Sequence, residues 1–427
     1  MNVAIYTLRS VAYAIIDPSL VIVLIILGII FYNQNRKTTV MQKMIIGERL
    51  HSPLELTLSQ LVIGILAGTI GSLIFSYLGI MFPENSGIEF LFLVSILLML
   101  FKPRFFCFAY SGSILAAISL IVSYVYKSQE MAAPLNIDIV SLFTLIGILH
   151  IIEGILVMID GDKGAIPIFT TRGNKIIGGF AFKRYWALPV AIFIMYARKD
   201  SLSAGLISVN TPDWWPILKN TNTMDLIKNA VLAMIPFYGV LGYSSITFTK
   251  NKSMKALYSG IGILIFGVLL TAVAQLGRVG IIGEAIVIVF SPLAHELMIY
   301  IQKNFEEKAN PKFISDDEGI MVLEVAPQSP AYKAGIKSGD KLVEINGMEI
   351  FSEASVYEVL KENLNQVIFK IKDYKGNFKE LSLSRKGSER IGLVLVPRNL
   401  PKENQVVKFD NNKFQDMIEK FKNEKKE

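Results

Sequence analysis

The chain has only three histidines, and these are the first residues to weigh for chemistry: His51, His150 and His295. A zinc hydrolase site of the HExxH type needs two His one helical turn apart, so that both imidazoles reach the metal while the Glu activates water. No such pair occurs in the sequence. The segment "HIIEG" places His150 and Glu153 on one helical face, and "MIDG" adds a distant Asp160. One His, one Glu and one distant Asp are a poor set of zinc ligands, so we predict no metal site.

Serine and cysteine nucleophiles are no better supported. In "SPLAHE", Ser291 and His295 are four residues apart, but the glycine-framed nucleophile expected of such a pair is missing. Cys107 is the lone cysteine and lies in an apolar run, which excludes a disulfide framework and a thiol zinc site. We therefore predict no catalytic residue, no cofactor and no enzyme activity. Helix-to-helix hydrogen bonding and a polar cavity both stay open as roles for the ionisable residues in apolar segments, which are His150, Glu153, Glu284, His295 and Glu296.

These residues belong to a chain whose composition is typical of a membrane protein. It has 427 residues, of which 52% are hydrophobic and only 19% charged, and this is more apolar surface than one water-soluble core needs. A helix that spans a bilayer takes roughly 20 apolar residues. We predict a polytopic bundle of about eight or nine helical spans within residues 1–302. The expected spans are 12–32, 57–82, 87–101, 105–126, 137–159, 179–197, 226–248, 256–275 and 279–302.

Basic residues give the expected orientation. In a count of nine spans, the Lys- and Arg-rich loops all fall on one side, which the positive-inside rule assigns to the cytoplasm. These loops contain Arg36, Lys37, Lys43, Arg49, Lys102, Arg104, Lys163, Arg172, Lys175, Lys183, Arg184, Lys250, Lys252 and Lys255. The C-terminal region then lies in the cytoplasm too. The pI near 9.1 largely reflects these residues, so it gives no reason to invoke nucleic acid.

The region after the spans is typical of a small soluble domain. Residues 319–325 read as a strand, "SPAYKAGI" as a loop with a short helical turn, and 341–345 as a second strand. Ser352 can cap a helix whose Val356, Val359, Leu360 and Leu364 recur at helical spacing. A hairpin from residue 366 and a last strand, "IGLVLV", follow.

The pattern "SPA..AGI..GD.L..ING..I" resembles bacterial PDZ domains over about residues 309–398. The resemblance implies a groove between a strand and the longer helix, in which an extended peptide adds as a strand. The family's carboxylate loop is missing ahead of the first strand, but "RIGLVLV" supplies one at the end, as in the circularly permuted α/β arrangement. By this match the peptide-binding residues are Arg390, Ile391, Gly392, Leu393, Val394, Val356, Val359 and Leu360. A purely architectural role for these apolar residues stays open.

Residues 399–427 form a charged tail. Phe414, Met417, Ile418 and Phe421 have the spacing of an amphipathic helix, which would suit a partner or a membrane surface. A solvated tail is an equal alternative.

Spans without a catalytic motif, the basic loop with "FKRYW" and a terminal PDZ domain together resemble the membrane-bound topology determinants of cell division in Gram-positive bacteria. This resemblance implies a scaffold in the cell membrane, enriched at septum and poles, that positions the division inhibitors MinC and MinD through DivIVA. Homo-oligomerisation stays open.

Two other classes also stay open: a PDZ-containing intramembrane protease or its regulator, and a transporter with a regulatory PDZ domain. The first lacks a catalytic motif. The second usually shows internal repeats with broken helices, and no convincing repeat is present.

Overall fold

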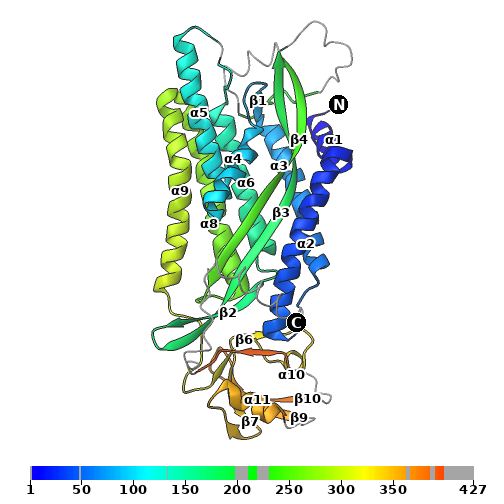
Figure 1. Cartoon of the computed structure of the whole chain (residues 1–427), viewed down its shortest axis with the longest axis vertical. Coiled ribbons are helices and arrows are strands. Elements are labelled where there is room, and N and C mark those ends of the chain that lie inside the picture. The colour runs from blue at the N-terminus through cyan, green and yellow to red at the C-terminus, as the bar shows by residue number, and fades with distance from the viewer. Residues whose placement is uncertain are drawn as a thin grey trace, which may run out of the picture.

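A computed structural model describes residues 2–47, 50–131, 133–197, 210–218, 230–361, 366–384 and 390–398. The molecule is elongated, with a long helical bundle above a small sheet domain (Figure 1). The tail at 399–427, with its amphipathic spacing, lies outside the described residues.

Six helices in the described residues are long and apolar enough to cross a membrane. They are α2 (Pro18–Ile46), α3 (Pro53–Leu78), α5 (Phe108–Ser128), α6 (Ile139–Asp160), α8 (Lys252–Ala274, continued by the 3-10 turn Gln275–Val279) and α9 (Ile281–Lys308). Shorter helices are α1 (Val3–Ile16) and α4 (Phe90–Phe101), and a 3-10 turn, Pro103–Phe106, leads into α5. Outward side chains of α2 and α9 are apolar, among them Ile26 and Leu293, as lipid-facing surfaces require.

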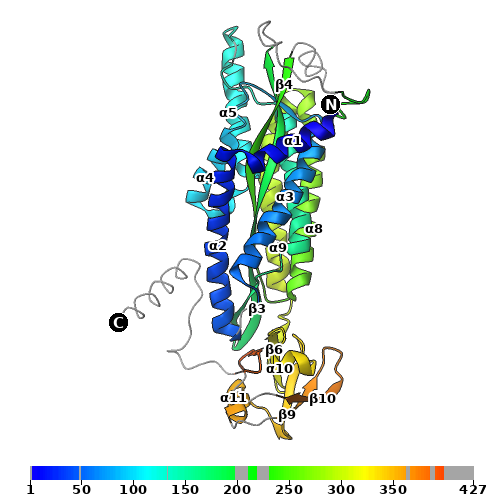
Figure 2. The same ribbon diagram turned by 90° about the vertical axis from the view of Figure 1, so that its right-hand side faces the viewer.

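The expected first span, 12–32, is in fact interrupted. Helix α1 ends at Ile16 and α2 begins at Pro18, because Asp17 takes an extended conformation and accepts hydrogen bonds from the amides of Ser19 (3.0 Å) and Leu20 (3.2 Å). An Asp N-cap followed by Pro is a strong helix start. The break turns α1 away from the axis of α2 at the end of the bundle far from the sheet domain (Figure 2).

The helical spans expected at 179–197 and 226–248 are wrong. Residues 179–197 lie in the long strand β3 (Lys175–Ala197) and residues 230–247 form β4 (Ala230–Thr247), and the two pair antiparallel from Phe180↔Thr247 to Ala197↔Ala230. Residues 226–229 lie outside the described residues. Strand β2 (Ile166–Arg172) pairs antiparallel with the start of β3, and β1 (Met81–Pro83) pairs parallel with its end. The hairpin of β3 and β4 runs along the bundle beside the helices (Figure 1, Figure 2).

Helix α3 covers the middle of β3 through small residues. A Cβ added at Gly64 or Gly68 would lie only 2.2 or 2.3 Å from the carbonyl oxygens of Ala187 and Pro189, so the two backbones touch. One turn further on, the Ser72 hydroxyl accepts a hydrogen bond of 2.9 Å from the Ala191 amide. Strand backbone at membrane depth must be covered by protein, and this face of α3 meets that demand.

A buried ion pair joins β3 to the end of α6. Arg184 was predicted to lie in a basic loop, but it lies in β3, is 1% exposed and donates through Nε to Asp160 at the end of α6, over 3.0 Å. The Trp186 indole donates to the same carboxylate oxygen (2.9 Å), and Lys163 pairs with its other oxygen (2.9 Å). Asp160 therefore holds β3 against α6.

The C-terminal domain is a sheet with strand order β10-β9-β7-β6-β11, and β8 pairs with β7. Its elements are β6 (Ile320–Val325), α10 (Pro330–Ala334), β7 (Lys341–Ile345), β8 (Met348–Glu349), α11 (Glu353–Lys361), β9 (Gln366–Lys372), β10 (Phe378–Ser384) and β11 (Leu393–Leu395). The predicted strands at 319–325 and 341–345 and the helix after Ser352 are confirmed. Of its expected apolar positions, Leu364 lies outside the described residues.

Candidate functional site

The loop before β11 adopts a turn that requires glycine. Gly392 has a φ of +74°, and a Cβ added there would lie 2.4 Å from the Ser329 Cβ and 2.9 Å from the Ala326 Cβ. The loop's carbonyls are already engaged, because Ala331 donates to Ile391 O (3.1 Å) and Ala326 to Gly392 O (2.8 Å). Within the described part of the chain, the amides of Ile391 and Gly392 donate no hydrogen bond. The loop thus presents free donors on a glycine-dependent turn.

Most of the predicted groove residues gather in one apolar cluster. Ile391 and Leu393 pack in the same core as Val356 and Leu360 of α11, and Val359 lies partly exposed at its edge. Strand β11 ends the sheet, so in the described residues its outer edge has no strand partner. A strand edge, an apolar cluster under a helix and free amides therefore occur together, as strand addition of a peptide requires.

Val394 and Arg390 are placed differently. Successive side chains of a strand point to opposite faces, and Val394 packs in the cluster of the membrane domain rather than the cluster under α11. Arg390 is exposed, and its guanidinium lies 3.5 Å from the Gly47 carbonyl oxygen after α2. Neither side chain joins the cluster that holds Ile391 and Leu393.

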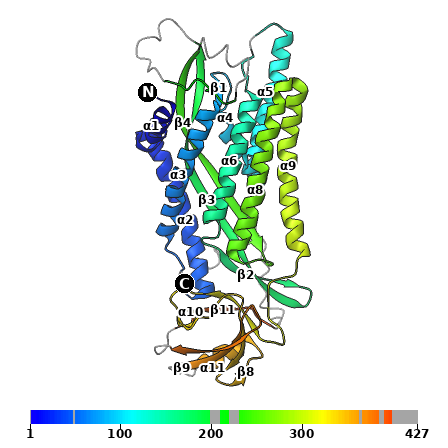
Figure 3. The same cartoon turned by 180° about the vertical axis from the view of Figure 1, so that it is seen from behind.

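The sheet domain is docked onto the membrane domain. Strand β5 (Phe313–Ile314) pairs antiparallel with Ile177 and Gly178 of β3, and the fully buried Phe313 ring meets Phe180 edge to face at 5.6 Å between centroids. A Cβ at Gly178 would lie 2.9 Å from Val396 and 3.1 Å from Leu323. Figure 3 shows β11 on the side of the sheet domain that faces the bundle. The β6–β11 pair therefore has two buried faces, one toward its own core and one toward the bundle.

Charges reinforce the docked arrangement. Lys252 at the start of α8 forms an ion pair with Glu324 of β6. Arg172 of β2 donates to the carbonyls of Glu307 and Ala309, over 2.6 and 2.9 Å, where the chain leaves α9. Lys252 and Arg172, two of the basic residues predicted to share one side of the membrane, thus lie beside the sheet domain. Arg104, from the same predicted set, does not, because it pairs with Glu296 in the middle of α9.

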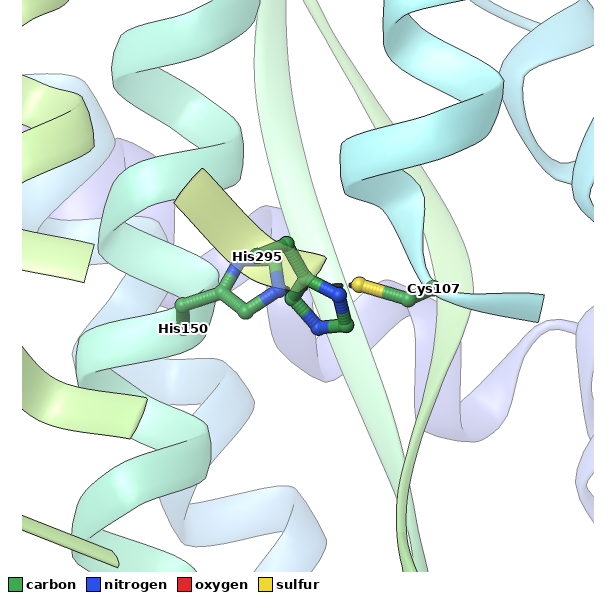
Figure 4. Close-up of side chains that lie close together, drawn as sticks. All are labelled: Cys107, His150 and His295. Carbon is green, nitrogen blue, oxygen red and sulfur yellow. Dashed lines mark hydrogen bonds between the residues drawn. The ribbon is translucent and has the colours of Figure 1, made fainter. Parts of the chain in front are cut away.

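A second cluster of functional side chains lies inside the bundle. Cys107, His150 and His295 each present a potential ligand atom, and these atoms all lie within 4.8 Å of one another. The side chains come from the start of α5, from α6 and from α9 (Figure 4). The prediction of no metal site did not consider this cluster, because Cys107, His150 and His295 are far apart in the sequence.

The pairings of Ser291 with His295 and of His150 with Asp160, for which the sequence offered little support, do not form among the described residues. The Ser291 hydroxyl donates to the Ala109 carbonyl (3.2 Å), and His295 bonds through Nδ1 to the Tyr110 hydroxyl (3.0 Å), so no Ser–His hydrogen bond connects them. Asp160 serves the Arg184 ion pair rather than His150. Glu296 accepts from Tyr110 (2.7 Å) and pairs with Arg104 (3.2 Å).

A family model described as a PDZ domain matches residues 321–371. Together with the apolar helices, this defines a membrane protein that carries a PDZ domain. The chain is similar to the cell division topological determinant MinJ of Bacillus subtilis (strain 168), with 22% identity over 263 residues that cover 59% of this chain and 62% of MinJ. It is MinJ-like in this sense, and the match spans about three fifths of that relative's length.

Other relatives match a much shorter stretch. The chain is 41% identical over 56 residues to the serine protease HTRA3 of Rattus norvegicus, which is 13% of this chain and 12% of that protease. It is 45% identical over 47 residues to the serine protease Do-like HtrB of Bacillus subtilis (strain 168), 11% of this chain and 10% of HtrB. These likenesses are confined to the PDZ region.

Proposed function

We propose that this chain is a membrane-anchored, non-catalytic adaptor that recruits cytoplasmic division proteins through its PDZ domain and takes part in placing the division site. One observation carries the proposal. The similarity to MinJ covers 263 residues, whereas the PDZ match covers only 321–371, so the likeness extends well into the membrane domain. The similarity to proteases stays within the PDZ region. A shared PDZ domain alone gives no reason to assign proteolysis.

The proposed docking surface is the groove between β11 and α11. The free amides of Ile391 and Gly392 would receive a peptide carboxylate, the edge of β11 would pair with the peptide backbone, and the cluster around Val356 and Leu360 would hold its apolar side chain. The permuted arrangement belongs to this proposal. It is supported by the antiparallel pairing of β11, which comes last in the chain, with β6 (Leu393↔Val325).

The PDZ domain is proposed to lie in the cytoplasm. Support comes from two basic residues near the PDZ domain: Lys252 pairs with Glu324, and Arg172 donates hydrogen bonds to the carbonyls of Glu307 and Ala309. A reporter fused after Glu427 is expected to read cytoplasmic. An extracytoplasmic reading would contradict the adaptor, whose proposed partners of the MinD and DivIVA type are cytosolic.

Complementation of a Bacillus subtilis strain that lacks MinJ tests the proposed function. The parent chain should restore division at the normal sites, and fluorescent partner proteins should gather at the septum. The informative variant is Val359→Lys, which places a charge at the partly exposed edge of the groove cluster. Its matched control is Ala354→Lys, an exposed position on the same helix with the same charge change. Restoration by the control but not by Val359→Lys supports the proposal.

The choice of Val359 avoids a structural problem at Gly392. A side chain at Gly392 would collide with Ser329 and Ala326, so Gly392→Val would disrupt the loop itself and could not separate docking from folding. Equal restoration by Val359→Lys and the parent chain would exclude this groove as the recruiting surface. Failure of the parent chain at normal abundance would remove the support for a division role.

A further inference from the structure

The neighbours of His150 fix which of its nitrogens faces Cys107. Its Nδ1 lies 2.8 Å from the Ile146 carbonyl oxygen, which can only accept, so Nδ1 carries the proton. Its Nε2 is then unprotonated, lies 3.0 Å from the Cys107 sulfur and accepts a hydrogen bond from that thiol. The same backbone carbonyl holds the imidazole ring in this orientation.

The neighbours of His295 fix the same tautomer. The Tyr110 hydroxyl donates its proton to Glu296 (2.7 Å), so it accepts from Nδ1 of His295 (3.0 Å). The Nε2 lone pair of His295 is therefore available, and within the described residues no hydrogen bond engages it. Arg104 forms an ion pair with the second oxygen of Glu296 (3.2 Å), so Glu296, Tyr110 and His295 form one chain of polar contacts that starts at Arg104.

The two histidines thus have the outer contacts that metal ligands usually have. A ligating His almost always donates its second ring nitrogen to a carbonyl, a carboxylate or a comparable acceptor, which fixes tautomer and ring orientation. Here His150 donates to a backbone carbonyl and His295 to a tyrosine that is itself bound to a carboxylate. The Phe266 ring packs against both imidazoles, with centroids 4.9 and 5.3 Å away, and keeps one side of the cluster apolar.

We propose that the buried His150 and His295 and the partly buried Cys107 form a site for a d10 transition-metal ion, Zn²⁺ or Cu⁺, which ties α5, α6 and α9 together. One thiolate and two imidazoles suit both ions. With Zn–S near 2.3 Å and Zn–N near 2.0–2.1 Å, ligand atoms around one ion are about 3.6 Å apart. The Cys107 sulfur lies 3.0 Å from Nε2 of His150, and one ring nitrogen of His295 lies within 4.8 Å of the ligand atoms of the other two residues, so a shift of about 1 Å brings the three to that spacing.

Proton and charge balance distinguish the two ions. Binding exchanges the Cys107 thiol proton for the metal and releases one H⁺ per ion, so affinity rises with pH. Cu⁺ with one thiolate gives a neutral site, which a low-dielectric interior favours. Zn²⁺ leaves one positive charge and takes a fourth ligand. Glu153, one turn after His150 on α6, is the nearest acidic residue of that helix and could supply the balancing charge.

The test measures metal in the full-length protein, purified in lipid nanodiscs after loading with Zn²⁺ or, under reducing conditions, with Cu⁺. Mass spectrometry of the elements should find about one ion per parent chain after removal of weakly bound metal. The control His51→Ala should keep the same content, because His51 is remote from the cluster and pairs with Glu55. Cys107→Ser, which removes the sulfur but keeps a small polar side chain, should lower the content about tenfold or more.

A second readout covers the case in which Cys107→Ser fails to fold. Because the chain contains a single cysteine, a thiolate-to-cobalt charge-transfer band after Co²⁺ loading of the parent can come only from Cys107. The band, or a stoichiometric Cu⁺ content, supports the site and identifies the ion it prefers. Folded Cys107→Ser with the metal content of the parent overturns the proposal. A parent chain that takes up neither ion and shows no cobalt band overturns it as well, and the cluster is then a hydrogen-bonded contact between helices.

Discussion

Replacing Phe313 by Ala should loosen the docking of the PDZ domain while leaving both domains folded. Phe313 is fully buried where β5 pairs with β3, and its ring meets Phe180 at 5.6 Å. Truncation of a buried Phe to Ala costs about 3–5 kcal/mol. Other apolar contacts of the interface remain, among them Leu323 and Val396 against Gly178.

The size of the effect follows from this cost. Phe313 is one of several buried apolar side chains of the sheet domain that pack in the cluster of the membrane domain, and each contributes about 1.5–3 kcal/mol before the cost of ordering. Loss of about 3–5 kcal/mol raises the population of the undocked state relative to the docked state by about a hundredfold to a thousandfold or more.

Hydrogen exchange provides the assay. The Lys312 amide donates to the Phe248 carbonyl (2.8 Å) across the interface, so its exchange reports undocking. In Phe313→Ala this amide should exchange much faster, whereas amides in the β6–β7 pair should change little. The control is Phe351→Ala, because Phe351 is 65% exposed on the same domain. Unchanged protection of Lys312 in a folded Phe313→Ala protein would refute the argument that this ring holds the two domains together.

Three further predictions concern the buried ion pair, the packing of α3 and a surface charge network. Asp160→Asn leaves Arg184 buried without its charged partner and should destabilise the membrane domain by about 3–5 kcal/mol in a thermal unfolding assay. The control is Asp317→Asn, at an exposed ion pair with Arg398, which should change stability by less than about 1 kcal/mol in the same assay. Gly64→Val should abolish the folded membrane domain, because the new Cβ would lie 2.2 Å from the Ala187 carbonyl oxygen. Gly28→Ala should be tolerated, because its Cβ would meet only Leu61, at 3.6 Å. The yield of monodisperse protein measures whether each variant folds. Hydrogen bonds from Lys372 and Lys341, with the charges of both amines, lower the pKa of Glu318 from 4.5 to about 2. The stabilisation by the Glu318 carboxylate is therefore fully present above about pH 4.5 and is lost as the pH falls toward 2. Glu318→Gln should flatten this part of the curve of PDZ-domain stability against pH. An unchanged slope would contradict this role of Glu318.

The PDZ domain was predictable because its signals are local. Gly335 has a φ of +93° after α10, as its place at the end of the predicted helical turn requires, and Asn346 and Gly347 form the turn between β7 and β8. Alternating apolar residues in 341–345 and helical spacing after Ser352 also specify elements within a few residues. Docking on the bundle was not predictable, because Leu323 and Val396 look like ordinary strand residues until Gly178 is placed against them.

The two strands taken for helical spans show where hydropathy is insufficient. A long apolar run has the same hydropathy as a helix or as a strand buried on both faces. Pro189 and Pro236 were the available warning, since a helix interior loses a hydrogen bond at proline. In the hairpin they lie opposite Tyr238 and Ala191. The aromatic and glycine-rich content of both segments points the same way.

The cluster of Cys107, His150 and His295 could not be predicted from spacing. Metal motifs are recognisable when the ligands share a helix or a loop, as in HExxH. Here each ligand comes from a different segment, and only the packing of α5, α6 and α9 brings the three together. The tautomers that expose both Nε2 atoms likewise depend on Ile146 and Tyr110, which carry no sequence signal of that role.

Direct binding of a cytosolic division protein of the DivIVA or MinD type to the full chain in nanodiscs tests the central claim most directly. Affinities would be measured for the parent, Val359→Lys and Ala354→Lys at one salt concentration. The adaptor account predicts that Val359→Lys binds about tenfold or more weakly, a loss of about 1.4 kcal/mol or more, while Ala354→Lys binds like the parent. Equal binding by all three folded proteins, or no binding by the parent, would contradict the claim that the groove between β11 and α11 recruits these partners.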